Sequence, residues 1–300
     1  MVPNAELRRR AAAALQGKWQ TALLVGLIAS APNLIAQVMG IVTHATLTDR
    51  LYNILATLTM NDLQFPERVL NAFISAVPRN TAMLNSLLTL LGMVLTPVLV
   101  LGMNRHLLNI QRGQEGSINE AFALLGRFFK ALLLQIVIVI KIALWSIPGI
   151  IALVVFIAAM LTSGNGSVEL LLSGYYLCFA LMVVPAVMAW CRYAMSTFVV
   201  ADAPETGVLA AIRRSKQLMK NRKGKYFGLV VTYLLLNMAA NMLANLVSGI
   251  FGFVIAQTLA LMVQLMITVY ITAVYGAFYL DCSDAENAAP ADGQQEIPEL

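Results

Sequence analysis

The chain has 300 residues, of which 59% are hydrophobic and 12% charged, and its formal net charge is +5. Ordinary soluble domains are roughly 45 to 50% apolar and about 25% charged, so this composition excludes a soluble globular protein. Most of the length must lie in lipid or be buried by partners.

Six apolar runs are long enough for helices that cross a bilayer, which needs about 20 residues. They cover residues 19–42, 84–108, 131–156, 170–200, 226–247 and 254–280. The first run follows three arginines, as a signal peptide would, but it continues past the small residues at 28–31, which favours an uncleaved spanning helix. We therefore predict an all-α polytopic membrane protein with about six transmembrane helices, forming a single membrane domain over residues 1–280.

The segments between and after the runs differ in length. Residues 43–83 form a long connection in which "RLYNILATL" and "PERVLNAFISAV" predict two short amphipathic helices. Residues 281–300 hold six carboxylates and no cation, together with Pro, Gly and Gln. This composition is typical of a disordered, acidic tail.

Lys and Arg residues are distributed unequally between the two sides that alternating spans would define. One side holds Arg8, Arg9, Arg10, Lys18, Arg105, Arg112, Arg127, Lys130 and the seven cations of residues 213–225. The other side holds only Arg50, Arg68 and Arg79. The positive-inside rule therefore places both termini and the segment over residues 213–225 in the cytoplasm.

The densest cationic segment directly precedes the fifth run. It comprises Arg213, Arg214, Lys216, Lys220, Arg222, Lys223 and Lys225. Cations at this position orient a spanning helix and attract anionic phospholipid. Nucleic acid is a poor fit as a partner, because only Tyr226 and Phe227 provide aromatic rings next to the cations.

Two cytoplasmic segments are predicted to be amphipathic surface helices. The first follows "SINE" at 117–120, which matches a capping box before an apolar pattern with helical spacing. The second follows Pro204 and places Val208, Leu209, Ile212 and Met219 near one face, with cations on the other. Such helices bury one side among lipid headgroups.

The residues that carry most enzyme chemistry are scarce in the runs. All fifteen acidic residues fall outside the interiors of the six spans, and His44 and His106 are far apart. Cys178, Cys191 and Cys282 form no metal-ligand or disulfide pattern. We therefore expect no catalytic residue, no metal, no cofactor and no enzymatic activity.

Two cations do lie within the spans. Lys141 is ten residues past Ala131, about 15 Å along a helix and near the middle of a bilayer. No intramembrane carboxylate is available to pair with it, so either the charge is structural or it binds a phosphate or carboxylate. Arg192 lies eight residues from the end of its span, where its side chain could reach the headgroups or contribute to the same anion site.

Polar residues form one stripe on each of the last two spans. Asn237, Asn241 and Asn245 recur every four residues on the fifth, and Gln257 and Gln264 lie on the sixth. Hydrogen bonds between the two helices would explain both stripes. The alternative is a water-lined path of a small-solute transporter or channel, to which breaks at Pro32, Pro97, Pro148 and Pro185 of the first four spans could contribute.

Four stretches in matching order resemble a known family. They are "ELRRRAAAALQGKWQTALLV" near the start, "LWSIPGII" at 144–151, "AIRRSKQLMKNRKGKYF" at 211–227 and "GAFY" at 276–279. Together they resemble the bacterial integral membrane proteins called domain of unknown function 975. The resemblance implies a multi-pass protein of the cytoplasmic membrane and carries over no catalytic residue.

These observations favour a non-enzymatic membrane protein that binds anionic lipid or supports the organisation of the envelope. Its expected partners are the lipid bilayer, other membrane proteins or further copies of the chain. The transporter or channel remains the alternative.

Overall fold

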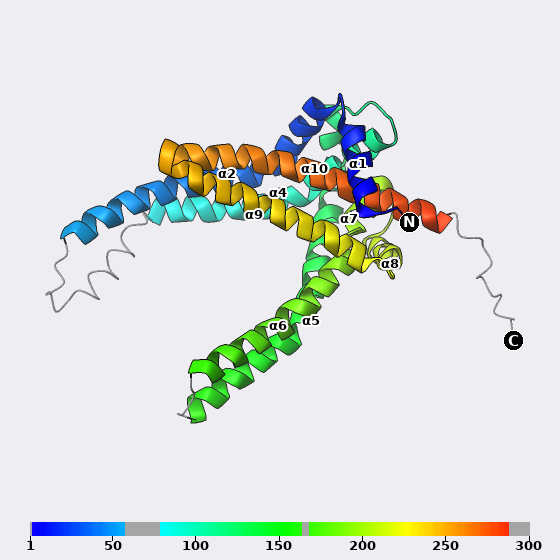
Figure 1. The fold of residues 1–300 in the computed structure, drawn as a ribbon. Helices are drawn as coiled ribbons and strands as arrows, with labels where there is room; N and C mark the ends of the chain where they lie inside the picture. Colours follow the sequence, from blue (N-terminus) through cyan, green and yellow to red (C-terminus); the bar gives the residue numbers. More distant parts are fainter. Residues whose placement is uncertain (1, 58–78, 164–167, 288–300) are drawn as a thin grey trace, which may run out of the picture. The chain divides into compact units, whose positions relative to one another are not determined.

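The structure is a computed structural model that describes residues 2–57, 79–163 and 168–287 (Figure 1). Within these ranges the chain contains helices and short connections and no strand, which confirms the all-α prediction. The α-helices are α1 (Asn4–Leu15), α2 (Trp19–Thr57), α4 (Arg79–Gln111), α5 (Phe128–Ser163), α6 (Val168–Tyr193), α7 (Ser196–Asp202), α8 (Val208–Leu218), α9 (Lys223–Phe251) and α10 (Phe253–Asn287). Two short 3₁₀ helices, η1 (Ile118–Ala121) and η2 (Leu125–Arg127), lie between α4 and α5 in this described part.

Six stretches of the described residues are long and apolar enough to cross a membrane. They are Trp19–Ile41, Met83–Gln111, Ile118–Met160, Ser173–Asp202, Lys223–Phe251 and Phe253–Glu286. Each overlaps one predicted span, so the six-span prediction is confirmed. Large apolar side chains on them are exposed, such as Leu246 at 72% and Ile250 at 77%. Such an exposed apolar surface is stable in lipid and not in water, as expected of a multi-pass membrane protein.

The connection between the first two spans contains more continuous helix than predicted. The first candidate span ends at Ile41 and the second begins at Met83, close to the predicted bounds of the connection. Helix α2 nevertheless continues to Thr57 and α4 begins at Arg79, so the prediction of a separate helix at "RLYNILATL" is wrong for residues 50–57. No Gly or Pro occurs between residues 43 and 57, so nothing in the sequence ends the helix where the apolar run ends. The other predicted helix, at 66–77, lies outside the described residues.

The acidic tail also begins later than predicted. Helix α10 runs to Asn287, and Cys282 within it is fully buried, so disorder from residue 281 is wrong for residues 281–287. Two cations hold this end of the helix. Arg222 donates a 2.9 Å hydrogen bond to the Cys282 carbonyl, and Arg214 lies 2.6 Å from the Glu286 carboxylate. Residues 288–300 lie outside the described part of the chain.

The chain divides into two compact units. Unit 1 comprises Met1–Ala13, Gly126–Val230 and Val274–Leu300, and unit 2 comprises Ala14–Leu125 and Val231–Ala273. Helices α9 and α10 each contribute to both units. The expectation of a single membrane domain over 1–280 stays a prediction.

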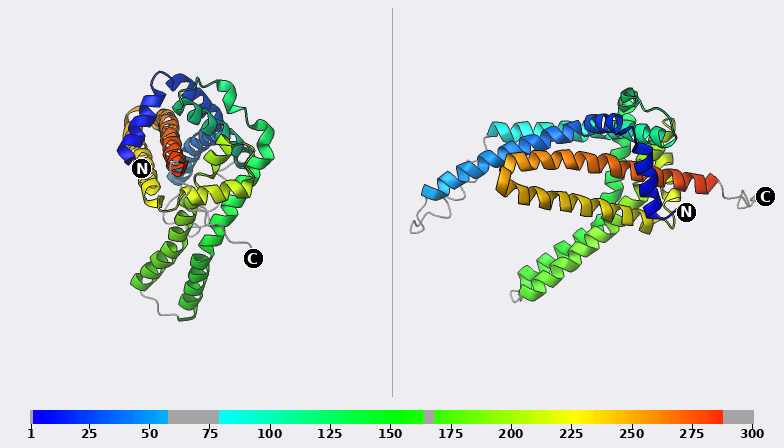
Figure 2. Two further views of the ribbon diagram at one scale, coloured as in Figure 1. Left: turned by 90° about the vertical axis from the view of Figure 1, so that its right-hand side faces the viewer. Right: turned by 45° about the horizontal axis from the view of Figure 1, so that its top comes forward.

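In unit 1, α5 and α6 form an antiparallel helical hairpin (Figures 1 and 2). Close approach is possible because glycines face the partner helix. A Cβ atom built on Gly149 would lie 2.3 Å from the Met182 backbone, and one on Gly174 would lie 2.1 Å from the Phe156 ring. Small residues are a common means of packing helices tightly in lipid, where no hydrophobic force brings them together. Helices α7 and α8 pack against each other, and α8 also contacts α5 and α6.

In unit 2, the main helix pair is α2 with α4. Gly92 on α4 lies against Pro32 on α2, and Gly26 on α2 lies against Val269 on α10. Pro32, Pro97, Pro148 and Pro185 all lie inside helices that continue past them. The broken helices that a transport site could use are therefore not present at these four prolines.

Candidate functional site

The segment predicted as an amphipathic surface helix over 117–133 is instead two 3₁₀ turns followed by the start of α5. Ser117 does cap η1, because its Oγ accepts a 3.3 Å hydrogen bond from the Asn119 amide. The second half of the predicted capping box is wrong, because the Glu120 side chain does not turn back to Ser117. It bonds to α4 instead, and this contact holds the segment in place.

Glu120 joins a buried polar cluster that the sequence reasoning missed. Its Oε2 atom lies 2.8 Å from His106 Nδ1, and its Oε1 atom accepts a 2.6 Å hydrogen bond from Asn109 Nδ2. The His106 ring is fully buried, and its Nε2 atom has no partner within the described residues. Gly116 is required beside the ring, since a Cβ there would lie 2.4 Å from His106 Cε1. His106 and Glu120 are fourteen residues apart, so no local spacing could have predicted the pair.

The cationic segment over residues 213–225 lies on α8, the turn after it and the start of α9. The apolar face of α8 is buried by protein, with Ala211, Ile212, Leu218 and the following Met219 all at 2% exposure or less. Contacts with α5, α6 and α7 cover this face, so it does not need the headgroups to bury it. Leu209, which was predicted on the same face, is 60% exposed, because the buried side is centred on residues 211, 212, 215 and 218.

The structure separates the seven cations of this segment into two groups. Arg214, Arg222 and Lys225 bond to Glu286, the Cys282 carbonyl and the Val2 carbonyl, and Lys216 lies 5.9 Å from the Tyr193 ring. Arg213, Lys220 and Lys223 have no hydrogen bond, ion pair or ring contact within the described residues. These three charges are therefore available to an external anion.

Lys141 and Arg192 lie on the two helices of the α5–α6 hairpin. The Gly149–Met182 and Gly174–Phe156 contacts set a register that places Lys141 level with Trp190, two residues from Arg192. The Arg192 guanidinium lies 4.9 Å from the Trp145 ring of α5, a cation–π contact that holds it against the hairpin. Lys141 is half-buried and has no partner in the part of the chain that the structure describes.

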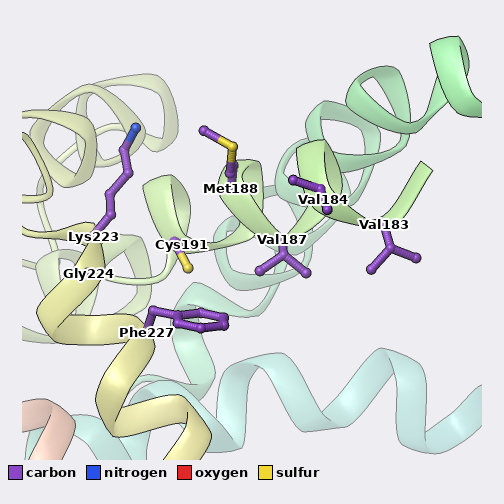
Figure 3. Close-up of a pocket in the computed structure, with 8 residues that line it drawn as sticks. All are labelled: Val183, Val184, Val187, Met188, Cys191, Lys223, Gly224 and Phe227. Carbon is purple, nitrogen blue, oxygen red and sulfur yellow. The ribbon is translucent and has the colours of Figure 1, made fainter. Parts of the chain in front are cut away.

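An apolar groove lies between α6 and the start of α9 in unit 1 (Figure 3). Its volume is about 480 Å³. The residues that line it are Val183, Val184, Val187, Met188, Cys191, Lys223, Gly224 and Phe227. Lys223 is the one charged residue among them, and Cys191 is only 3% exposed. The sequence reasoning named Lys223 but not the apolar residues beside it, because they are about thirty-five residues away in the chain.

A second groove of about 310 Å³ lies on the other side of the same α6 ridge. It is lined by Ile142 and Ser146 of α5 and by Met182, Val183, Ala186, Val187 and Trp190 of α6. Val183 and Val187 contribute to both grooves. Lys223 is part of the lining of the first groove. Lys141 does not line the second groove but immediately precedes Ile142, which does.

These sites belong to a chain that matches one family over most of its length. The family described as "Protein of unknown function (DUF975)" matches residues 1–286. The chain belongs to the DUF975 family. This match confirms the resemblance carried by the four sequence stretches. Neither a curated protein nor a solved structure matches the chain.

The polar stripes of this DUF975 chain do not join its last two spans through the predicted hydrogen bonds. Asn237 Nδ2 donates to the Tyr233 carbonyl and Asn241 Nδ2 donates to the Asn237 carbonyl, both within α9. On α10, Thr268 likewise donates to the Gln264 carbonyl. Asn241 and Asn245 are exposed, Gln257 and Gln264 are half-buried, and no hydrogen bond links the two stripes among the described residues.

The described residues of the DUF975 chain contain no group of three or more His, Cys, Asp or Glu side chains that could hold a metal ion. The arrangement that they do contain is an apolar groove with an unpaired cation in its lining. Such a site is suited to an amphiphile with an anionic end.

Proposed function

We propose that this DUF975 protein is a multi-pass protein of the bacterial cytoplasmic membrane that binds anionic phospholipid and catalyses no reaction of its own. One observation carries the proposal: Arg213, Lys220 and Lys223 have no partner within the described residues, although they lie directly before a spanning helix. Cations near a membrane surface attract anionic lipid by about 1 kcal/mol each. Through this binding the protein would organise lipid or neighbouring membrane proteins.

The contacts of unit 1 support the proposed orientation, with both termini in the cytoplasm. Asn4 Nδ2 donates a 3.1 Å hydrogen bond to the Lys225 carbonyl, and Lys225 Nζ donates to the Val2 carbonyl. The N-terminus and the cationic segment therefore lie at one end of the unit. Since α10 ends beside the same segment through Glu286, the described C-terminal end is there too. The positive-inside rule assigns such a cation-rich end to the cytoplasm.

The transporter or channel has less support. The side-chain amides of Asn237 and Asn241 donate hydrogen bonds to backbone carbonyls of their own helix, α9. The prolines of the first four spans lie within continuous helices. Both features are the ordinary ways in which a lipid-facing helix tolerates a polar or proline residue.

The lipid preference can be measured by native mass spectrometry of the full chain, released from nanodiscs that contain equal amounts of phosphatidylglycerol and phosphatidylcholine. We expect phosphatidylglycerol to be retained at least about tenfold better, and the triple variant Arg213→Gln, Lys220→Gln, Lys223→Gln to lose most of this preference. The variant Asn241→Leu on the polar stripe is the matched control and should retain the preference. Equal retention of both lipids by the wild type would refute the proposal.

Lys141 is expected to contribute separately from the cationic segment, because it lies within the α5–α6 hairpin and has no partner in the described residues. Lys141→Ala should reduce the retention of anionic lipid, though less than the triple variant does, since a half-buried charge in lipid requires a counter-charge. Arg192→Ala should have a smaller effect, because the Arg192 guanidinium is already held against Trp145. A Lys141→Ala protein that retains as much phosphatidylglycerol as the wild type would show that Lys141 is only structural.

A further inference from the structure

The groove between α6 and α9 has the shape of a site for an extended apolar chain. The lining residues of α6 run from Val183 to Cys191, eight residues along one helix, or about 12 Å at 1.5 Å per residue. Val184 is 56% exposed and Phe227 is 47% exposed, and these two side chains form the walls. Cys191, at the other end of the α6 lining from Val183, is buried. An occupant would therefore lie along the helix, in the direction that acyl chains take in a bilayer.

One end of this groove is chemically different from the rest. Figure 3 shows the Lys223 side chain extending away from the Phe227 ring, with its nitrogen at the far end. This ammonium has no partner within the described residues, and no carboxylate lines the groove. A lysine stem commonly covers apolar surface while its charged end stays at the polar boundary. The groove therefore presents an apolar floor and a single positive charge.

The cations beside Lys223 in sequence do not share this arrangement. Arg222 is bonded to the Cys282 carbonyl and Lys225 to the Val2 carbonyl, so both help to hold the unit together. Lys223 alone of the three is left in the groove lining without a partner in the described part of the chain. Its charge is thus available to an anionic ligand in the groove.

We infer that this groove is a specific site for one anionic phospholipid of the surrounding bilayer, with an acyl chain between α6 and Phe227 and the headgroup phosphate on Lys223. This inference rests on the lipid binding proposed above and adds the place and the geometry of the site. Charge complementarity identifies the occupant, because the lining offers one ammonium and no acceptor side chain. An extended peptide would leave its backbone polar groups without partners against this lining, which lipid does not.

One glycine of α9 allows the groove to be filled, and a second glycine of the same helix provides the control. A Cβ atom on Gly224 would meet nothing within 4 Å, and Gly224 lines the groove, so we expect the side chain of Gly224→Leu to occupy part of the groove. Gly249, on the same helix but outside the groove, also has nothing within 4 Å. Gly249→Leu is therefore the matched control. Both changes replace a poor helix former with a good one, so neither should impair folding.

The test uses the full-length protein, phosphatidylglycerol carrying a photoactivatable diazirine on one acyl chain, and the matching phosphatidylcholine probe. After illumination, peptide mass spectrometry locates the crosslinks. We expect the phosphatidylglycerol probe to label residues 183–191, Gly224→Leu to abolish this labelling, and Gly249→Leu to leave it unchanged. Lys223→Gln should lower it about fivefold, and more than Lys220→Gln does.

Three outcomes would overturn the inference. Equal labelling of residues 183–191 by the two probes would mean ordinary lipid contact without recognition of the headgroup. Wild-type labelling in Gly224→Leu would place the bound lipid elsewhere, and no labelling of residues 183–191 in a protein that native mass spectrometry shows as a dimer would assign the groove to a second copy of the chain. The proposed function is tested independently by total retention of phosphatidylglycerol, so it can survive the loss of this site. If total retention shows no preference, both proposals fail.

Discussion

Gly149→Ala is expected to destabilise the α5–α6 hairpin by about 1 to 3 kcal/mol, the usual effect of inserting a methyl group into a packed interior. The added Cβ would lie 2.3 Å from both the Cα and the backbone nitrogen of Met182. A backbone atom cannot move aside by changing rotamer, so the two helices must separate along their contact. The loss should appear as a lower midpoint of thermal unfolding in detergent.

The control for this substitution is Gly249→Ala, which makes the same chemical change on a helix. A Cβ atom there would meet nothing within 4 Å, and alanine stabilises a helix relative to glycine. Its midpoint should therefore equal or exceed that of the wild type. If Gly149→Ala behaves like Gly249→Ala, the close packing of α5 on α6 is wrong.

Glu120→Ala is expected to destabilise unit 2, because the carboxylate accepts hydrogen bonds from two side chains. His106 is fully buried and already lacks a partner at Nε2 within the described residues, so its ring would lose the hydrogen bond at Nδ1 as well. Asn109 would lose its 2.6 Å bond in the same step. Each buried donor left without an acceptor costs about 1 to 3 kcal/mol. The connection between α4 and α5 should then become sensitive to proteases.

Two further variants separate the hydrogen bonds from the loss of charge. Glu120→Gln keeps one acceptor oxygen and should give an intermediate stability. Glu115→Ala removes an exposed carboxylate from the same connection and should have no effect on the unfolding midpoint or on proteolysis. A Glu120→Ala protein as stable as the Glu115→Ala protein would contradict the role assigned to the cluster.

The sequence by itself determined the class of this protein, its six spans, its cationic segments and its family. Each of these depends on local composition, because a run of about 20 apolar residues partitions into lipid whatever it later packs against. Helix ends were less well predicted. The ends of α2 and α10 extend beyond the apolar runs, since a helix stops at a breaking residue or a lost contact and not where the lipid ends.

Only the tertiary structure decided which polar groups have partners. The sequence placed Glu120 in a capping pattern, but in the structure its carboxylate bonds to His106 and Asn109 of α4. Leaving these buried donors without an acceptor costs more free energy than leaving an exposed helix end to be hydrated by water. Likewise, the seven cations of residues 213–225 look alike in the sequence, but in the structure four of them contact other residues of the protein and three have no such partner among the described residues. The groove combines residues 183–191 with residues 223–227, and their proximity depends on how α6 and α9 pack, which no local pattern in the sequence encodes.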